Sequence, residues 1–77
     1  MAGDYLNIQI AAALKRLATD YPDLDFGVES SVVDAAETRL NAAWDAWPKG
    51  GPLNDVWRAL KDYREALLTA NGRRLFE

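Results

Sequence analysis

Proline and glycine divide this chain into three segments, and that division restricts its fold more than any other feature. Pro22 stands after the first segment, and residues 48–52 separate the second segment from the third. Proline lacks a backbone N–H donor and clashes with the preceding helical turn, so a helix rarely continues through it. Within each segment the apolar residues recur at the three- and four-residue spacing that is typical of an amphipathic helix.

The sequence therefore predicts an all-α fold in a single domain over residues 1–77. We expect a three-helix bundle with helices over about residues 4–20, 31–47 and 54–71 and a tail over residues 72–77. The second and third helices should form an antiparallel hairpin, because the Lys-Gly-Gly-Pro connection over residues 49–52 is a tight turn. The third helix has the widest apolar arc, so it should pack against both others.

The first helix is predicted to begin with Asp4 as its N-cap and to carry apolar residues on two strips. The broader strip is the expected core face and contains Leu6, Ile10, Ala13, Leu14, Leu17 and Tyr21. A second strip, on the other side of the helix, contains Tyr5, Ile8 and Ala12. Two interpretations of the second strip stay open: isolated apolar residues are common on surfaces, and an apolar strip can also contact another chain.

Residues 21–28 form a loop rich in turn residues, and we expect Leu24, Phe26 and Val28 to fold inward and close one end of the bundle. The carboxylates of this loop suggest a calcium site. An EF-hand needs Gly at its sixth position, but counting from Asp23 puts Gly27 at the fifth. We therefore expect no metal here.

The second helix should begin at Ser30 or Ser31, where Ser31 and Asp34 approximate a capping box. Its predicted core stripe is Val33, Ala36, Leu40, Ala43, Trp44 and Trp47. The third helix should bury a stripe that contains Leu53, Val56, Leu60, Tyr63 and Leu67, and it should stop at Asn71-Gly72.

Three tryptophans flank the predicted hairpin turn, and their role has two interpretations. Large aromatic side chains bury much apolar surface, so Trp44 and Trp57 should close the end of a small core. Tryptophan also dominates interface hot spots. Trp47 is last on its helix, and we expect it to be partly exposed and to contact a partner.

The tail offers a second candidate contact: Arg73, Arg74, Leu75 and Phe76 place a basic pair beside two apolar anchors, as short docking peptides do. The alternative is that Leu75 and Phe76 fold back onto the helices. The charges are uneven, because residues 1–27 and 28–51 each carry a net charge of −2 whereas residues 52–77 carry +1.

Composition excludes most catalytic chemistry. The chain has no His and no Cys, so it has neither a thiolate nucleophile nor an imidazole base, and it lacks the usual zinc ligands. We expect no enzyme activity, no cofactor and no metal. No signal peptide or membrane span is expected, and the absence of Cys suits a reducing compartment, so we expect a cytoplasmic protein.

Small size makes a partner the leading expectation. In a chain of 77 residues, one core rarely supplies more than about 3–5 kcal/mol. We therefore expect a non-enzymatic protein-interaction module: a regulator, an inhibitor or an assembly factor, of a kind that phages also encode. Its partner would be another protein or a second copy in a homodimer.

Two other functions are alternatives for a helical chain of this size. The stretch Phe26–Ser31 is loosely similar to the Gly-x-Asp-Ser-Leu motif of acyl and peptidyl carrier proteins, with Glu29 and Ser31 in place of Asp and Leu. The resemblance implies a phosphopantetheine group on Ser30. A small helical nucleic-acid-binding protein is the other alternative, but the basic residues of the third helix alternate with carboxylates.

Overall fold

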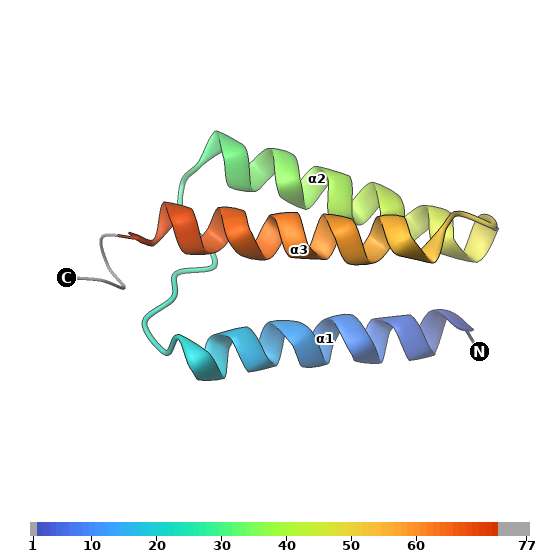
Figure 1. The fold of residues 1–77 in the computed structure, drawn as a ribbon, viewed down its shortest axis with the longest axis horizontal. Helices are drawn as coiled ribbons and strands as arrows, with labels where there is room; N and C mark the ends of the chain where they lie inside the picture. Colours follow the sequence, from blue (N-terminus) through green and yellow to red (C-terminus); the bar gives the residue numbers. More distant parts are fainter. Residues whose placement is uncertain (1, 73–77) are drawn as a thin grey trace.

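The computed structural model describes the backbone of residues 2–72 and the side chains of residues 5–72. Its elements are α1 (Ala2–Asp20), α2 (Ser31–Ala46), the single 3₁₀ turn η1 (Trp47–Lys49) and α3 (Leu53–Ala70). The all-α fold with three helices is thus confirmed, and α2 and α3 lie side by side as a hairpin (Figure 1). No helix within residues 2–72 is both long and apolar enough to cross a bilayer.

The two predicted caps at the starts of helices need correction. The helix α1 begins at Ala2, so Asp4 lies within its first turn and is not the N-cap. The N-cap of α2 is Ser30, whose backbone is extended and whose Oγ accepts the Val33 N–H at 3.3 Å. The predicted capping box on Ser31 is therefore wrong by one residue.

The α2–α3 connection is as tight as its glycines suggested. The α-helix ends at Ala46, one residue before the predicted end, because Pro48 has no N–H to continue the ladder. Gly50 adopts φ 95°, in the left-handed region that glycine tolerates best. The Gly51 N–H donates to the Ala46 carbonyl at 2.8 Å, and a Cβ on Gly51 would lie 2.8 Å from that same oxygen.

The two sides of α3 differ in the size of their apolar side chains. The backbones of α2 and α3 come within 8 Å of each other, whereas the principal close backbone approach of α1 is to η1. On the α2 side, Ala59 of α3 and Ala43 of α2 line the same shallow groove. On the α1 side, Leu60 and Trp57 line the space between α3 and α1. Alanine lets α2 approach closely, and the larger side chains hold α1 at a distance.

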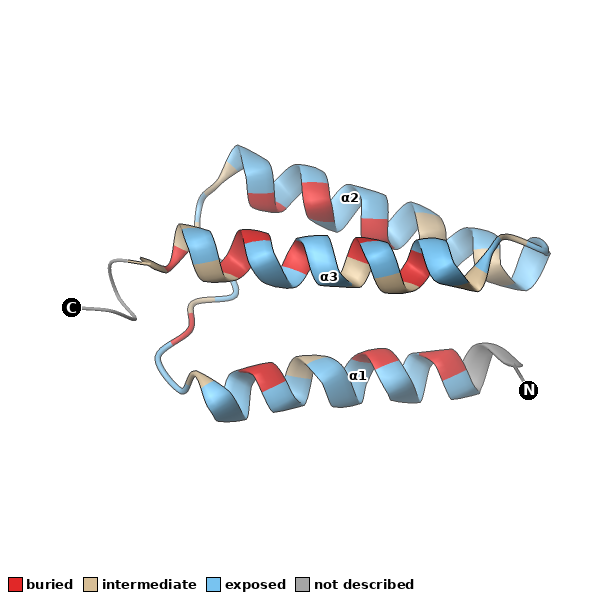
Figure 2. Ribbon diagram, viewed as in Figure 1, coloured by how far each residue is buried: buried red, intermediate tan, exposed pale blue. Residues whose placement is uncertain are grey.

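The core face of α1 follows the prediction with one exception. Leu6, Ile10 and Leu17 are buried, at 0–2% exposure, and the buried residues of α1 face the hairpin (Figure 2). Leu14 and Tyr21 are half-buried. Ala13 is exposed, contrary to the prediction, because it lies at the edge of the wide α1–α3 seam, where a methyl group is too short to reach across.

A buried asparagine fastens the α1–α2 loop to the end of α3. The Asn71 side chain is 3% exposed; its Oδ1 accepts the Asp25 N–H at 2.9 Å, and its Nδ2 donates to the Asp25 carbonyl at 3.1 Å. The same Nδ2 donates to the Leu67 carbonyl at 2.8 Å. Asn71 thus caps α3, as predicted, and also holds a loop 46 residues away in sequence.

This fastening explains why the loop closes the core only in part. Leu24 is buried and Val28 is half-buried, as expected, but Phe26 is 39% exposed. The Asp25 backbone is held by Asn71, and the Gly27 N–H donates to Asp25 Oδ1 at 2.9 Å. Phe26 is at the tip of that tight turn, so the inward orientation predicted for it is wrong.

Candidate functional site

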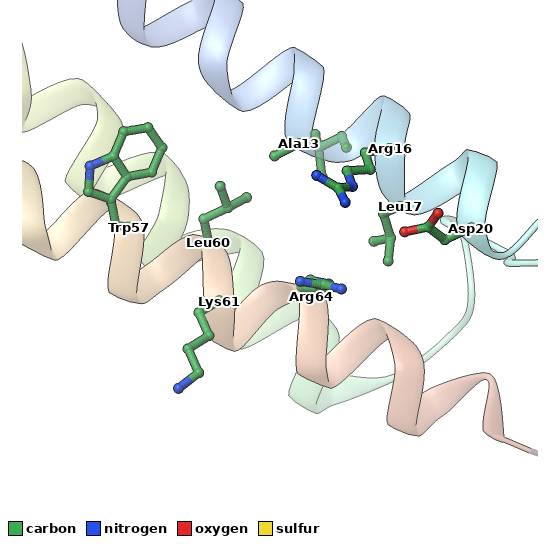
Figure 3. A pocket seen from close by; sticks show the side chains of 9 residues that line it. Ala13, Arg16, Leu17, Asp20, Trp57, Leu60, Lys61 and Arg64 are labelled. Carbon is green, nitrogen blue, oxygen red and sulfur yellow. The ribbon is translucent and has the colours of Figure 1, made fainter.

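A pocket of about 490 Å³ lies between the second half of α1 and the middle of α3. Figure 3 shows the two helices forming its walls, with side chains from both directed into it. Its apolar lining consists of Ala13, Leu14, Leu17, Trp57 and Leu60. The pocket exists because α1 approaches the rest of the fold closely at η1 and lies further from α3 along the remainder of its length.

The charged lining of this pocket is mainly basic. Arg16 and Asp20 come from α1, and Lys61 and Arg64 come from α3. In Figure 3 Arg16 extends from α1 toward α3 and Lys61 points away from the pocket. A guanidinium offers a planar fork of donors that suits carboxylates. An apolar floor beside two arginines is chemically suited to a ligand with an apolar body and a negative charge.

Of the two arginines that line the pocket, only Arg64 has a sequence position that attracts attention. Arg64 lies within the apolar arc of α3, between Trp57 and Leu68, a position where the stem of an arginine can pack on apolar neighbours, and in the structure this residue is exposed. Arg16 gave no signal, because it lies outside the core stripe of its helix. Its contribution depends on the spacing between α1 and α3, which sequence periodicity does not report.

The three tryptophans are all half-buried, and each has a different environment. Trp44 donates its indole N–H to Asn7 Oδ1 at 2.7 Å, which joins α2 to α1. Trp57 lines the pocket. Trp47 is partly exposed as predicted, but its Nε1 is buried and finds no acceptor among the described residues. Its role as a partner contact stays a prediction.

The outer strip of α1, defined as Tyr5, Ile8 and Ala12, is accessible along its whole length. Tyr5 is 62% exposed and Ile8 is 65% exposed, and Ala12 is also exposed. Whether a partner covers this strip stays a prediction. The other predicted contact, at Arg73, Arg74, Leu75 and Phe76, lies outside the described residues.

Ser30, the residue that the carrier-protein resemblance would modify, has a structural role in this fold because its hydroxyl caps α2. The carrier interpretation itself stays a prediction, as does the nucleic-acid interpretation. Within the described part of the chain, no group of three or more carboxylates could hold a metal ion.

The α2–α3 seam contains Tyr63, which is buried on α3. Burial raises the pKa of Tyr63, and the nearby negative charge of Glu37 raises this pKa further. Both effects favour the neutral phenol, so this side chain is not prepared to act as a base at neutral pH.

Comparison with known proteins provides no relative. No protein-family model matches this chain, and no curated protein or solved structure is significantly similar to it. The function of this chain is therefore inferred from its own surfaces.

Proposed function

We propose that this chain is a non-enzymatic helical protein-interaction module, acting as a regulator, an inhibitor or an assembly factor, and that it binds its partner through the outer strip of α1. The observation that supports the proposal is that α1 has apolar residues on two sides. Leu6 and Ile10 are buried against the rest of the fold, whereas Tyr5 and Ile8 are exposed at 62% and 65%.

The outer strip has the dimensions and chemistry of a small helical contact. Tyr5, Ile8 and Ala12 are spaced at i, i+3 and i+7, so they extend about 10 Å along one face at 1.5 Å per residue. Burying an isoleucine side chain stabilises a complex by about 1.5–3 kcal/mol, and tyrosine is frequent among interface hot spots. A strip of this size suits a partner groove that accepts two adjacent turns of a helix.

The composition supports a binding role in preference to catalysis. A chain with no His and no Cys would depend on Asp, Glu, Lys or Tyr for every proton transfer. The fold raises the pKa of Tyr63, so this phenol is less able to ionise near neutral pH. Binding requires none of these groups.

Site-specific crosslinking would test the proposal. A photoreactive amino acid at position 8 in cells of the source organism should trap a partner in a product of discrete mass. The matched control is position 32, because Val32 is 64% exposed and lies on α2, away from the strip. Equal crosslinking at both positions, or none at position 8, would contradict the proposal. In the full chain, Ile8→Glu should abolish the trapped product formed from a probe at position 12.

A further inference from the structure

The α1–α3 pocket has a charge opposite to that of the chain around it. The whole chain carries −3 at pH 7, but the pocket is lined by Arg16, Lys61 and Arg64 against one carboxylate, Asp20. Lys61 points away from the pocket (Figure 3), so Arg16 and Arg64 are the cations beside its apolar floor, and their guanidinium groups would bind an anionic occupant. The apolar floor requires that the occupant also bring an apolar group.

One segment of the same chain has this combination. Asp23 is exposed, and Phe26 is 39% exposed at the tip of the α1–α2 loop. The loop is already ordered, because Asn71 holds the backbone of Asp25 and Leu24 is buried beneath it. An ordered loop loses little conformational entropy when its exposed side chains are bound.

We propose that two copies of this chain associate reciprocally, with Phe26 of each copy entering the α1–α3 pocket of the other. The ring would pack on Trp57 and Leu60, and Asp23 would lie near Arg16 and Arg64. Aromatic rings pack favourably on indole and on guanidinium planes, and the guanidinium forks would bind the carboxylate. This interface is separate from the outer strip of α1.

The position of the two elements permits a closed dimer. Asp20 lines the pocket and ends α1, and the acidic loop begins at the next residue, so the pocket and the loop adjoin at the end of α1. A two-fold axis beside that end of the helix would place each loop against the opposite pocket and leave no open end. The contact is small in comparison with stable interfaces of about 1,200–2,000 Å², so the dimer should be weak and depend on concentration.

The test is sedimentation equilibrium of the full chain and its variants over a range of concentrations, at low and at high salt. The wild type should dimerise, and salt should weaken the dimer because the Debye length falls from about 30 Å at 0.01 M to about 3 Å at 1 M. Phe26→Ser and the double variant Arg16→Glu/Arg64→Glu should each weaken dimerisation by about tenfold or more.

Two matched controls show whether these effects are local. Val32→Ser removes another exposed apolar side chain, and Arg39→Glu reverses a charge in the groove on the opposite side of α3. Both should dimerise as the wild type does. Circular dichroism and thermal melting of every variant would separate lost association from lost folding.

A charge exchange tests the pairing itself. The Arg16→Glu/Arg64→Glu variant and the Asp23→Lys variant should each be monomeric, because each copy would meet its own charge. Their mixture should form a heterodimer, since each loop would then find an oppositely charged pocket. A destabilised fold could not produce that recovery.

The outcomes that would overturn this inference are distinct from those that would overturn the proposed function. A wild type that stays monomeric at every concentration, or a charge-exchanged mixture that does not pair, would overturn the reciprocal dimer alone. Self-association that Ile8→Glu abolishes and Phe26→Ser leaves unchanged would place the interface on the outer strip. The pocket would then have no role in association, and the proposed function would stand.

Discussion

The two seams of this small protein, α2–α3 and α1–α3, differ in how they are filled. At the α2–α3 seam, three alanines line a shallow groove together with four charged side chains, the helices approach closely, and a glycine turn joins them. The α1–α3 seam is lined by leucines, a tryptophan and arginines, and it leaves a pocket. Charged side chains line both seams, so the difference lies in the apolar ones: alanines let two helices approach closely, whereas larger apolar side chains hold helices apart and leave space that a ligand or a second chain can enter.

The largest effect should come from the side chain that attaches α1. Ile10→Ala should lower the free energy of unfolding by about 2–5 kcal/mol, because Ile10 is completely buried and its removal leaves a cavity. Ile8→Ala is the matched control on the same helix; since Ile8 is 65% exposed, the change should stay within about 0.5 kcal/mol. Urea denaturation monitored by circular dichroism measures both. Equal losses would mean that α1 is not attached through the face that contains Leu6, Ile10 and Leu17.

The second effect concerns the turn that closes the α2–α3 seam. Gly51→Ala should destabilise the fold by about 1–3 kcal/mol, because the new Cβ would lie 2.8 Å from the Ala46 carbonyl oxygen. The control is Gly72→Ala, where a Cβ would meet no atom within 4 Å. Thermal melting should separate the two variants clearly. A Gly51 variant as stable as the control would show that the hairpin turn adjusts without cost.

The third effect tests how the loop is joined to α3. Asn71→Ala would leave the Asp25 N–H and carbonyl without their partners, and an unsatisfied buried polar group costs about 1–3 kcal/mol. We expect the lower part of that range, because the loop can open to water. Asn41→Ala, on the exposed side of α2, is the control. Amide hydrogen exchange should rise at residues 24–28 in the Asn71 variant and not in the control.

These differences indicate what could be predicted from the sequence. Helical periodicity and the positions of Pro22 and Pro48 were sufficient for the three helices and the hairpin, since those signals are local. Phe26 could not be placed, because its orientation depends on the Asn71 hydrogen bonds to a loop distant in sequence. Arg16 and Arg64 line the same pocket only because of the distance at which α1 packs against α3. Sequence periodicity does not report that distance. The predicted outer strip of α1 is exposed, and its partner remains to be tested.

The smallest expected effect is a pH dependence within the α2–α3 seam. Burial, and then the charge of Glu37, raise the pKa of Tyr63 above its usual 10.0, so the folded state keeps a proton that the unfolded state releases. Stability should therefore fall as pH rises above about 10, and it should fall less in Tyr63→Phe, which cannot ionise. Tyr5→Phe is the control, because the Tyr5 ring is 62% exposed and lies outside the seam. Melting temperatures measured from neutral to alkaline pH would show the difference as a smaller alkaline decline for Tyr63→Phe than for the wild type. Parallel declines in all three proteins would mean that folding does not raise the pKa of Tyr63, and that the close α2–α3 seam leaves its hydroxyl in contact with water.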